Sequence, residues 1–280
     1  MSETPTYALL PSRALIAVSG PDWRDFLQGL VTQDVETLGL GEARFGALLT
    51  PQGRLFYDLF AVGREEGAWL DVEAEHRTAL IQRLTMYRLR AKVEIAASDS
   101  SVSALFPGDP CSQLGGEGLV RDPRLPGLGW RGYGVTEPDG ARPGDETAYD
   151  AHRLALGVPG PADWGSDKTY PIEADFDLLG GIDFKKGCFV GQETTSRMKR
   201  RGQVKSRMLP IAFEGPPPAP GSEVLAGDLR AGEVLSGRDG RAIALLRLDR
   251  ASGASLTVDG HPVTVERPAW FLAALGAEAA

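Results

Sequence analysis

The sequence predicts an α+β protein with a C-terminal β-barrel, and two observations support this class. From Leu15 to Ile95, strand-like and helix-like apolar patterns alternate in the order strand, helix, hairpin, helix, strand, which is typical of a sheet covered by helices. After Arg207 the pattern changes to short apolar runs separated by turns. We therefore expect an α+β region over residues 1–206, with a subdomain break near 100–145 left open, and a barrel domain over residues 207–280.

The first expected elements are a strand at residues 15–18 and a helix from about residue 21 to residue 31. Pro21 suits the first helical position, because the N–H that it lacks would have no partner there. Trp23 and Leu27 belong to an apolar stripe at the spacing of one helical face. This helix should therefore pack against the core.

A hairpin, a second helix and another strand are expected next. The hairpin turns at residues 51–53, where Pro and Gly separate two apolar runs. Apolar residues at helical spacing over 80–87 predict the helix, and alternation over 90–95 predicts a half-buried strand. Residues 107–146, rich in Gly, Pro and Asp, are interpreted as loop and hairpin.

The last part of the chain has the texture of a small all-β module. Asp239-Gly240 and Asp259-Gly260 are strong hairpin turn signals. They separate apolar runs at residues 208–213, 232–235, 242–248 and 256–265. A barrel is the closed form that such a set of short strands favours.

Composition is that of a globular protein, with 42% hydrophobic and 24% charged residues and a net charge of −8. No run approaches the roughly 18 apolar residues that a membrane span requires. The N-terminus lacks a basic segment followed by a long apolar one, so we expect a cytoplasmic protein without membrane contact. The negative charge argues against nonspecific nucleic-acid binding.

The segment FKKGCFVGQETTSRMKRRG, residues 184–202, contains one of the two cysteines, Cys188. A lysine pair precedes Cys188, and a helix is expected to begin just after Gly191. Nearby cations and a helix N-terminus both favour the thiolate, which is the reactive and metal-binding form. A zinc or iron–sulfur site usually takes about four protein ligands, so a metal bound through Cys188 would be shared with a partner. Cys111 lies in a Pro/Gly-rich loop and is given no role.

A run of basic residues follows the motif. Six lysines and arginines lie between Arg197 and Arg207 with no acidic residue among them. Such a run is either a solvated helix face or an anion-binding patch, and both readings stay open. His76 and His261 show no ligand spacing and are expected to be solvated.

The segment KGCFVGQE resembles the signature of the YgfZ family, folate-binding proteins that assist iron–sulfur cluster assembly and repair. Residues 18–35, 48–60 and 86–95 also resemble YgfZ and the related aminomethyltransferase (T-protein) of the glycine cleavage system. The resemblance covers nearly the whole chain. It implies an aminomethyltransferase-like folate-binding region in a ring-like arrangement, a C-terminal β-barrel, and tetrahydrofolate or a derivative as cofactor.

Two departures from the T-protein bear on the activity. Arg77 stands where the T-protein has a carboxylate for transfer chemistry, and Ala155 where it has an acid that binds the pterin. The resemblance thus implies a chain that keeps the fold without the transfer groups.

The same resemblance implies folate contacts near the motif. Gln192 and Glu193 would contact the turn or a ligand, or would simply begin the helix. The folate glutamate would be received by basic side chains: Lys185, Lys186, Arg197 and Arg201. His152 would either line the folate pocket or be a hydrogen-bonded surface histidine.

The leading interpretation is a folate-binding accessory factor for iron–sulfur cluster assembly or repair. Cys188 would ligate a [2Fe-2S] cluster shared with an A-type carrier protein, or form mixed disulfides, on behalf of cluster-containing client enzymes. An effect on tRNA modification would be indirect. The alternatives are a tetrahydrofolate-dependent one-carbon transferase, which needs a pocket carboxylate, and an RNA-binding module, ranked last because no aromatic residues interleave with the basic run.

Overall fold

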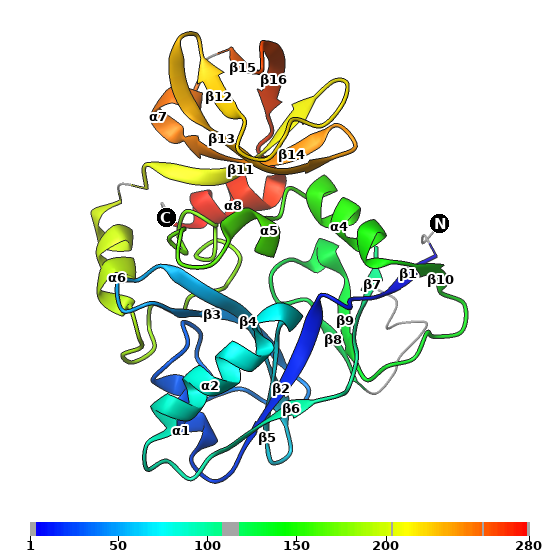
Figure 1. The fold of residues 1–280 in the computed structure, drawn as a ribbon, viewed down its shortest axis with the longest axis vertical. Coiled ribbons are helices and arrows are strands. Elements are labelled where there is room, and N and C mark those ends of the chain that lie inside the picture. Colours follow the sequence, from blue (N-terminus) through cyan, green and yellow to red (C-terminus); the bar gives the residue numbers. More distant parts are fainter. Residues whose placement is uncertain (1–3, 108–117, 203, 254, 279–280) are drawn as a thin grey trace.

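The protein is described by a computed structural model over residues 4–107, 118–202, 204–253 and 255–278 (Figure 1). It contains two five-stranded sheets and a closed barrel. Figure 1 shows the barrel at one end of the molecule, with the helices α4, α5 and α8 between it and the sheets. The predicted α+β class with a C-terminal barrel is confirmed. No helix in the described ranges has the length and apolar character needed to cross a membrane.

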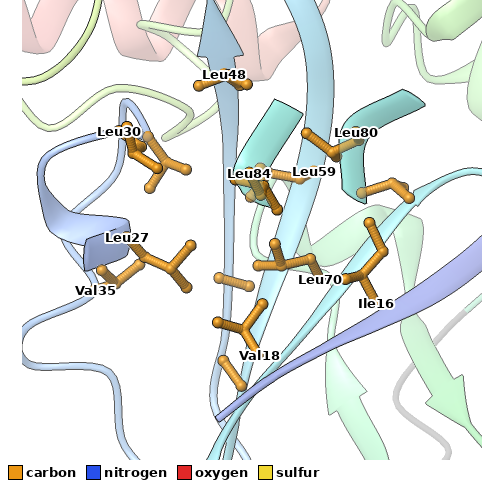
Figure 2. Close-up of a cluster of buried hydrophobic side chains, with 14 of the residues drawn as sticks. Ile16, Val18, Leu27, Leu30, Val35, Leu48, Leu59, Leu70, Leu80 and Leu84 are labelled. Carbon is orange, nitrogen blue, oxygen red and sulfur yellow. The ribbon is translucent and has the colours of Figure 1, made fainter. Parts of the chain in front are cut away.

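The first sheet is antiparallel and has the order β3-β4-β5-β2-β6. Its strands are β2 (Arg13–Ser19), β3 (Ala43–Leu49), β4 (Leu55–Arg64), β5 (Gly67–Glu73) and β6 (Glu94–Ser98). The helices α1 (Trp23–Gln28) and α2 (Arg77–Arg88) contribute Leu27, Leu80 and Leu84 to the core that the sheet also lines (Figure 2). The predicted hairpin at residues 51–53 and the second helix are confirmed.

Two boundaries in this region differ from prediction. The first helix ends at Gln28, and the buried Leu30 and Val31 continue its apolar stripe outside the helix, so spacing alone overestimated its length. The strand expected at 90–95 begins only at Glu94, because α2 ends in a tight turn at Leu89, whose φ is 46°.

The second sheet has the order β10-β1-β7-β9-β8 and is antiparallel except for the β1–β10 pair. Its strands are β1 (Thr6–Leu9), β7 (Val102–Phe106), β8 (Leu119–Arg121), β9 (Trp130–Tyr133) and β10 (Arg142–Gly144). The hairpin expected within residues 107–146 is the β8–β9 pair. Cys111 lies outside the described residues.

Helices and irregular chain link this sheet to the barrel. They include α4 (Glu146–Ala155), whose first turn is capped by the Asp145 side chain accepting from the Ala148 N–H at 2.9 Å. The short helix α5 (Pro161–Trp164) and the motif helix α6 (Gln192–Arg201) follow. Two 3₁₀ turns, η1 (Ala74–His76) and η2 (Pro126–Leu128), follow β5 and β8.

The barrel closes in the order β11-β14-β13-β12-β15-β16. Its elements are β11 (Ser206–Phe213), β12 (Glu223–Ala226), β13 (Leu229–Arg238), β14 (Arg241–Arg247), α7 (Leu248–Ala251), β15 (Leu256–Val258), β16 (His261–Val265) and α8 (Ala269–Glu278). Asp239 and Asp259 both have φ near 50° and lie in tight turns, as their Asp-Gly pairs predict.

Polar contacts fix the barrel to the rest of the chain. The indole N–H of Trp270 donates to the Leu156 carbonyl at 2.8 Å, and Ser236 on β13 hydrogen-bonds Asp163 on α5. Arg207 on β11 is 2% exposed and binds Asp175 and Asp177 at 2.8 Å each. The barrel is therefore held against the helices that border the cavity described next.

Candidate functional site

A cavity of about 930 Å³ lies where the two sheets, the linking helices and the barrel meet. The first sheet contributes Arg13, Asp58 and Glu73, and the second contributes Arg131. Side chains from η1, α4, α5 and β13 complete the lining, among them Glu75, His76, Tyr149, Asp150, Arg153, Ala162 and Arg238. All three parts of the fold thus surround one cavity, in the ring-like arrangement that the resemblance implies.

A buried ion network forms one wall of this cavity. Asp71 is 0% exposed and accepts from Arg13 Nε at 2.7 Å and from Arg131 Nη2 at 2.5 Å. The Tyr133 hydroxyl lies 3.1 Å from the same carboxylate. Burial alone would raise the pKa of Asp71, but the two guanidiniums lower it below its ordinary value. Asp71 therefore stays ionised as the centre of the wall.

Further guanidiniums of the wall have carboxylate partners of their own. Arg124 Nη2 lies 2.7 Å from Asp122 Oδ2 and donates to the Tyr149 hydroxyl at 2.8 Å. Arg153 Nη1 lies 2.9 Å from Asp163 Oδ2, which couples α4 to α5. Because these arginines are paired with carboxylates of the wall, their main role is to stabilise the shape of the cavity.

Asp58 and Glu73 are less completely paired. Arg13 Nη1 binds Asp58 Oδ2 at 2.9 Å, whereas Asp58 Oδ1 is buried without a hydrogen-bond partner among the described residues. Burial, and then the negative charge of Asp58, raise the pKa of Glu73 to about 7. Glu73 can therefore exchange a proton near neutral pH.

Carboxylates line this cavity, although they are not at Arg77 or Ala155, where the resemblance places the acids of the T-protein. Arg77 points elsewhere, since its Nη1 donates to the Ser98 carbonyl at 3.2 Å, and Ala155 is exposed. The pocket carboxylates come from Asp58 within β4, from Glu73 and Glu75 at the end of β5 and in η1, and from α4. Asp58 itself was a usable signal, because an Asp inside an otherwise apolar strand needs a special environment.

His76 also differs from prediction. It was expected to be solvated, but it is half-buried, lies 5.3 Å from the Tyr57 ring between centroids and lines the cavity. The reason is that it ends the η1 turn directly after β5, which turns the chain toward the cavity. His261, on β16 of the barrel, is exposed as expected.

Cys188 lies on an exposed loop just before α6, and the predicted helix start is confirmed. Its neighbour Phe189 is buried in the core, which anchors the loop. Gly191 has φ 79° and approaches the β3–β4 turn so closely that a Cβ would lie 2.6 Å from the Thr50 carbonyl oxygen. The glycine is therefore required both for backbone conformation and for space.

The lysine pair has two different settings. Lys186 Nζ donates to the carbonyls of Val31 and Gln33 at 2.6 and 2.8 Å, and burial lowers its pKa to about 8. Lys185 has an exposed side chain, and its N–H donates to Asp183 Oδ1 at 2.7 Å. Lys186 thus ties the loop to the first sheet's side of the molecule.

The remaining predicted site residues lie near the loop or on α4. Gln192 and Glu193 begin α6, and Glu193 Oε1 lies 3.9 Å from Arg197 Nη1. Arg201 ends the helix, and its side chain lies outside what the structure describes. His152 Nε2 lies 2.8 Å from the Gly127 carbonyl oxygen, and its ring stacks on Phe106.

The motif loop and the cavity are distinct places. Of the predicted site residues whose side chains are described, none lines the cavity: Lys185, Lys186, Cys188, Gln192, Glu193, Arg197 and His152. The basic run also breaks up, because Arg207 is buried with Asp175 and Asp177 and does not belong to a surface patch.

Comparison with a solved structure and with a family model defines the class of fold. The fold resembles the glycine cleavage system aminomethyltransferase T from Bartonella henselae, with a TM-score of 0.76 at 17% identity over 95% of this chain and 86% of that one. Residues 205–272 match the family described as the CAF17 C-terminal beta-barrel domain. The chain therefore has an aminomethyltransferase-like fold with a CAF17-type barrel.

Curated relatives narrow this class. The mitochondrial iron–sulfur cluster assembly factor IBA57 of Mus musculus is 32% identical over 281 residues, covering 87% of this chain and 78% of that protein. The Homo sapiens protein of the same name is 31% identical, with the same coverage. A Neurospora crassa homologue is 34% identical over 239 residues, and the alignment spans 54% of its length. The chain belongs to the IBA57 family, which supports the resemblance to YgfZ.

These relatives correct one expectation. The proteins from Mus musculus, Homo sapiens and Neurospora crassa are all named as mitochondrial, so the expected cytoplasmic location is wrong by this comparison. The sequence argument considered only apolar secretory leaders, whereas organelle-targeting segments are amphipathic.

Proposed function

We propose that this protein assists iron–sulfur cluster assembly or repair by presenting the Cys188 thiol to a partner. The exposure of Cys188 on a loop fixed on both sides is the observation that carries the proposal. Membership of a family whose curated relatives are named as iron–sulfur cluster assembly factors supports it. An exposed thiol on a fixed loop can meet a partner without unfolding of the chain.

A single thiol supplies one ligand, so the partner has to supply the others. An A-type carrier protein is the proposed partner, with the [2Fe-2S] cluster as cargo and cluster-containing enzymes as final clients. In repair, the Cys188 thiolate would instead attack a client disulfide, forming one mixed disulfide and releasing one client thiolate. An effect on tRNA thiolation would follow indirectly from the state of the thiolating enzymes.

We place a tetrahydrofolate ligand in the cavity. Its volume of about 930 Å³ falls within the roughly 300–1,000 Å³ of ordinary ligand pockets. Asp58 and Glu73 offer carboxylate oxygens to the N–H groups of a pterin, and Arg238 offers a guanidinium to a glutamate carboxylate. The predicted contacts on the motif side, at Lys185, Lys186, Arg197 and Arg201, remain a separate hypothesis for a longer polyglutamate tail.

Anaerobic reconstitution with iron and sulfide tests the role of the thiol. Wild type, Cys188→Ala and the control Cys111→Ala are compared by visible absorption, each alone and with an A-type carrier. We expect a shared cluster only when the carrier and Cys188 are both present, with Cys111→Ala behaving as wild type. A spectrum that is the same for Cys188→Ala and wild type would reject the shared-ligand form of the proposal.

A second candidate function is tetrahydrofolate-dependent one-carbon transfer. It is favoured by the carboxylates that the cavity contains, above all Glu73, whose pKa of about 7 suits proton exchange. Transfer of a formaldehyde equivalent to tetrahydrofolate by the purified protein, lost in Glu73→Gln and retained in Cys188→Ala, would establish it. If no transfer above the uncatalysed rate is found, this second function is rejected and the assembly role is the remaining proposal.

A further inference from the structure

The end of β5 gathers three metal-ligating side chains at the edge of the cavity. One ligand atom from each of Glu73, Glu75 and His76 lies within 4.8 Å of the others. His76 Nε2 is 3.9 Å from Glu73 Oε1 and 3.5 Å from Glu75 Oε1. All three belong to β5 and the η1 turn, so the backbone holds them together. The Glu75 side chain is 74% exposed and free to adjust around an ion.

A second observation comes from a different strand. Asp58 on β4 is 3% exposed, and its Oδ1 has no hydrogen-bond partner among the described residues. Arg13 holds Oδ2 at 2.9 Å, which fixes the orientation of the carboxylate. Asp58 lines the same cavity and lies within hydrogen-bond reach of Glu73. A buried carboxylate oxygen without a donor is costly, and a bound cation would satisfy it.

The charges around the cluster also favour a cation. Arg13 is the nearby guanidinium, and it is already shared between Asp58 and Asp71. Arg124, Arg131 and Arg153 bind other carboxylates of the wall. Glu73, Glu75 and Asp58 place three carboxylates beside one imidazole, and a divalent ion would offset the repulsion among them.

We propose that Glu73, Glu75 and His76, with Asp58 beside them, form a binding site for a divalent first-row transition-metal ion. An imidazole nitrogen with carboxylate oxygens and no thiolate suits Mn²⁺, Fe²⁺ or Zn²⁺ better than Mg²⁺ or Cu⁺. This site goes beyond the proposed function, because it uses neither Cys188 nor a carrier protein. It shares Asp58 and Glu73 with the proposed pterin contacts, so a metal ion and a pterin would compete for these carboxylates.

Titration of the full-length, tag-free chain with Mn²⁺ tests the site, followed by the electron paramagnetic resonance signal of the free ion. Mn²⁺ is chosen because its preference for oxygen and nitrogen ligands keeps it from the Cys188 thiol. We expect one ion per chain, with affinity lowered at least about tenfold in His76→Ala and in Glu75→Gln. The control His261→Ala removes an exposed histidine of the barrel and should bind as wild type.

Two results would overturn the site. One is the absence of saturable binding near one ion per chain. The other is binding that survives both His76→Ala and Glu75→Gln, or that His261→Ala weakens equally. Because Glu75 is exposed, the Glu75→Gln variant should fold normally. It therefore still tests the site if the His76→Ala variant is unstable. Cluster transfer through Cys188 can succeed or fail independently of every one of these outcomes.

Discussion

Arg131 on β9 and Asp71 on β5 join the two five-stranded sheets through a contact of 2.5 Å between Nη2 and Oδ2. Both side chains are almost completely buried, and Arg13 binds the other oxygen of the same carboxylate. One carboxylate thus bridges two guanidiniums that line the cavity. The same ion network therefore forms a wall of the cavity and connects the two sheets.

Removing that carboxylate's charge should destabilise the protein strongly. Asp71→Asn keeps the shape of the side chain but leaves Arg13 and Arg131 buried without their central counter-ion. We expect a loss of about 3–5 kcal/mol in the free energy of unfolding, measured by urea denaturation. The control Asp249→Asn breaks the exposed pair with Arg247 and should leave the unfolding midpoint unchanged. Equal effects of the two substitutions would show that the network is not structural.

Gly191 should be much less tolerant of substitution than Gly187, although both flank Cys188. Gly191→Ala places a Cβ 2.6 Å from the Thr50 carbonyl oxygen at a φ of 79°, whereas a Cβ at Gly187 meets nothing within 4 Å. We expect Gly191→Ala to cost about 2 kcal/mol or more in unfolding free energy and Gly187→Ala to be nearly neutral. Urea denaturation checks both. Faster alkylation of Cys188 in Gly191→Ala would add that the loop has moved.

Lys186 should make stability depend on pH in the alkaline range. Its pKa is about 8 in the folded protein and 10.5 in the unfolded chain, because the folded state buries the amine. Between these values the unfolded chain binds the extra proton, so raising the pH favours folding. Relative to Lys186→Met, wild type should gain about 1 kcal/mol from pH 8 to 10.5, a figure reduced for partial exposure of the amine.

The measurement is the difference in unfolding free energy between wild type and Lys186→Met at several pH values. Lys185→Met changes the neighbouring exposed side chain and is the matched control. Its unfolding free energy should change with pH in the same way as that of wild type. A constant difference between wild type and Lys186→Met across this range would contradict the prediction.

Arg238 should contribute to folate affinity if the cavity binds folate. It reaches the cavity from β13 of the barrel, where it can meet a glutamate carboxylate. We expect Arg238→Gln to raise the Kd for tetrahydrofolate about tenfold, measured by anaerobic titration calorimetry. Arg247→Gln, in an exposed pair on the barrel, is the control. Unchanged affinity in Arg238→Gln would show that the folate glutamate does not bind Arg238. The basic residues on the motif side would then be the next place to test.

The sequence was a good guide to local structure and to the barrel. Apolar spacing located α2, Asp-Gly pairs located two barrel turns, and Gly191 located the start of α6. The cavity was harder to predict because its residues come from both sheets, α4 and the barrel. Asp71 and Arg131 lie 60 positions apart in the chain, and no local pattern indicates such a pair.

Position in the chain also misled in two places. Arg207 continues a basic run, but it is the second residue of a barrel strand and its side chain binds Asp175 and Asp177. His76 stands among charged residues that read as surface, yet the η1 turn brings it to the cavity. In both cases the tertiary contact, and not the local composition, decides the environment.

The separation of the motif loop from the cavity lining has a genetic consequence. Cys188→Ala removes the thiol of the motif loop, and Arg238→Gln changes the cavity. Among the described residues, Cys188 does not line the cavity, so each allele damages only one of the two regions. If each task is performed independently, two such alleles expressed together should complement one another in a cell that lacks the wild-type gene. If one molecule has to perform both tasks in the same encounter, a cell that expresses both alleles will remain as defective as a cell that expresses either allele alone.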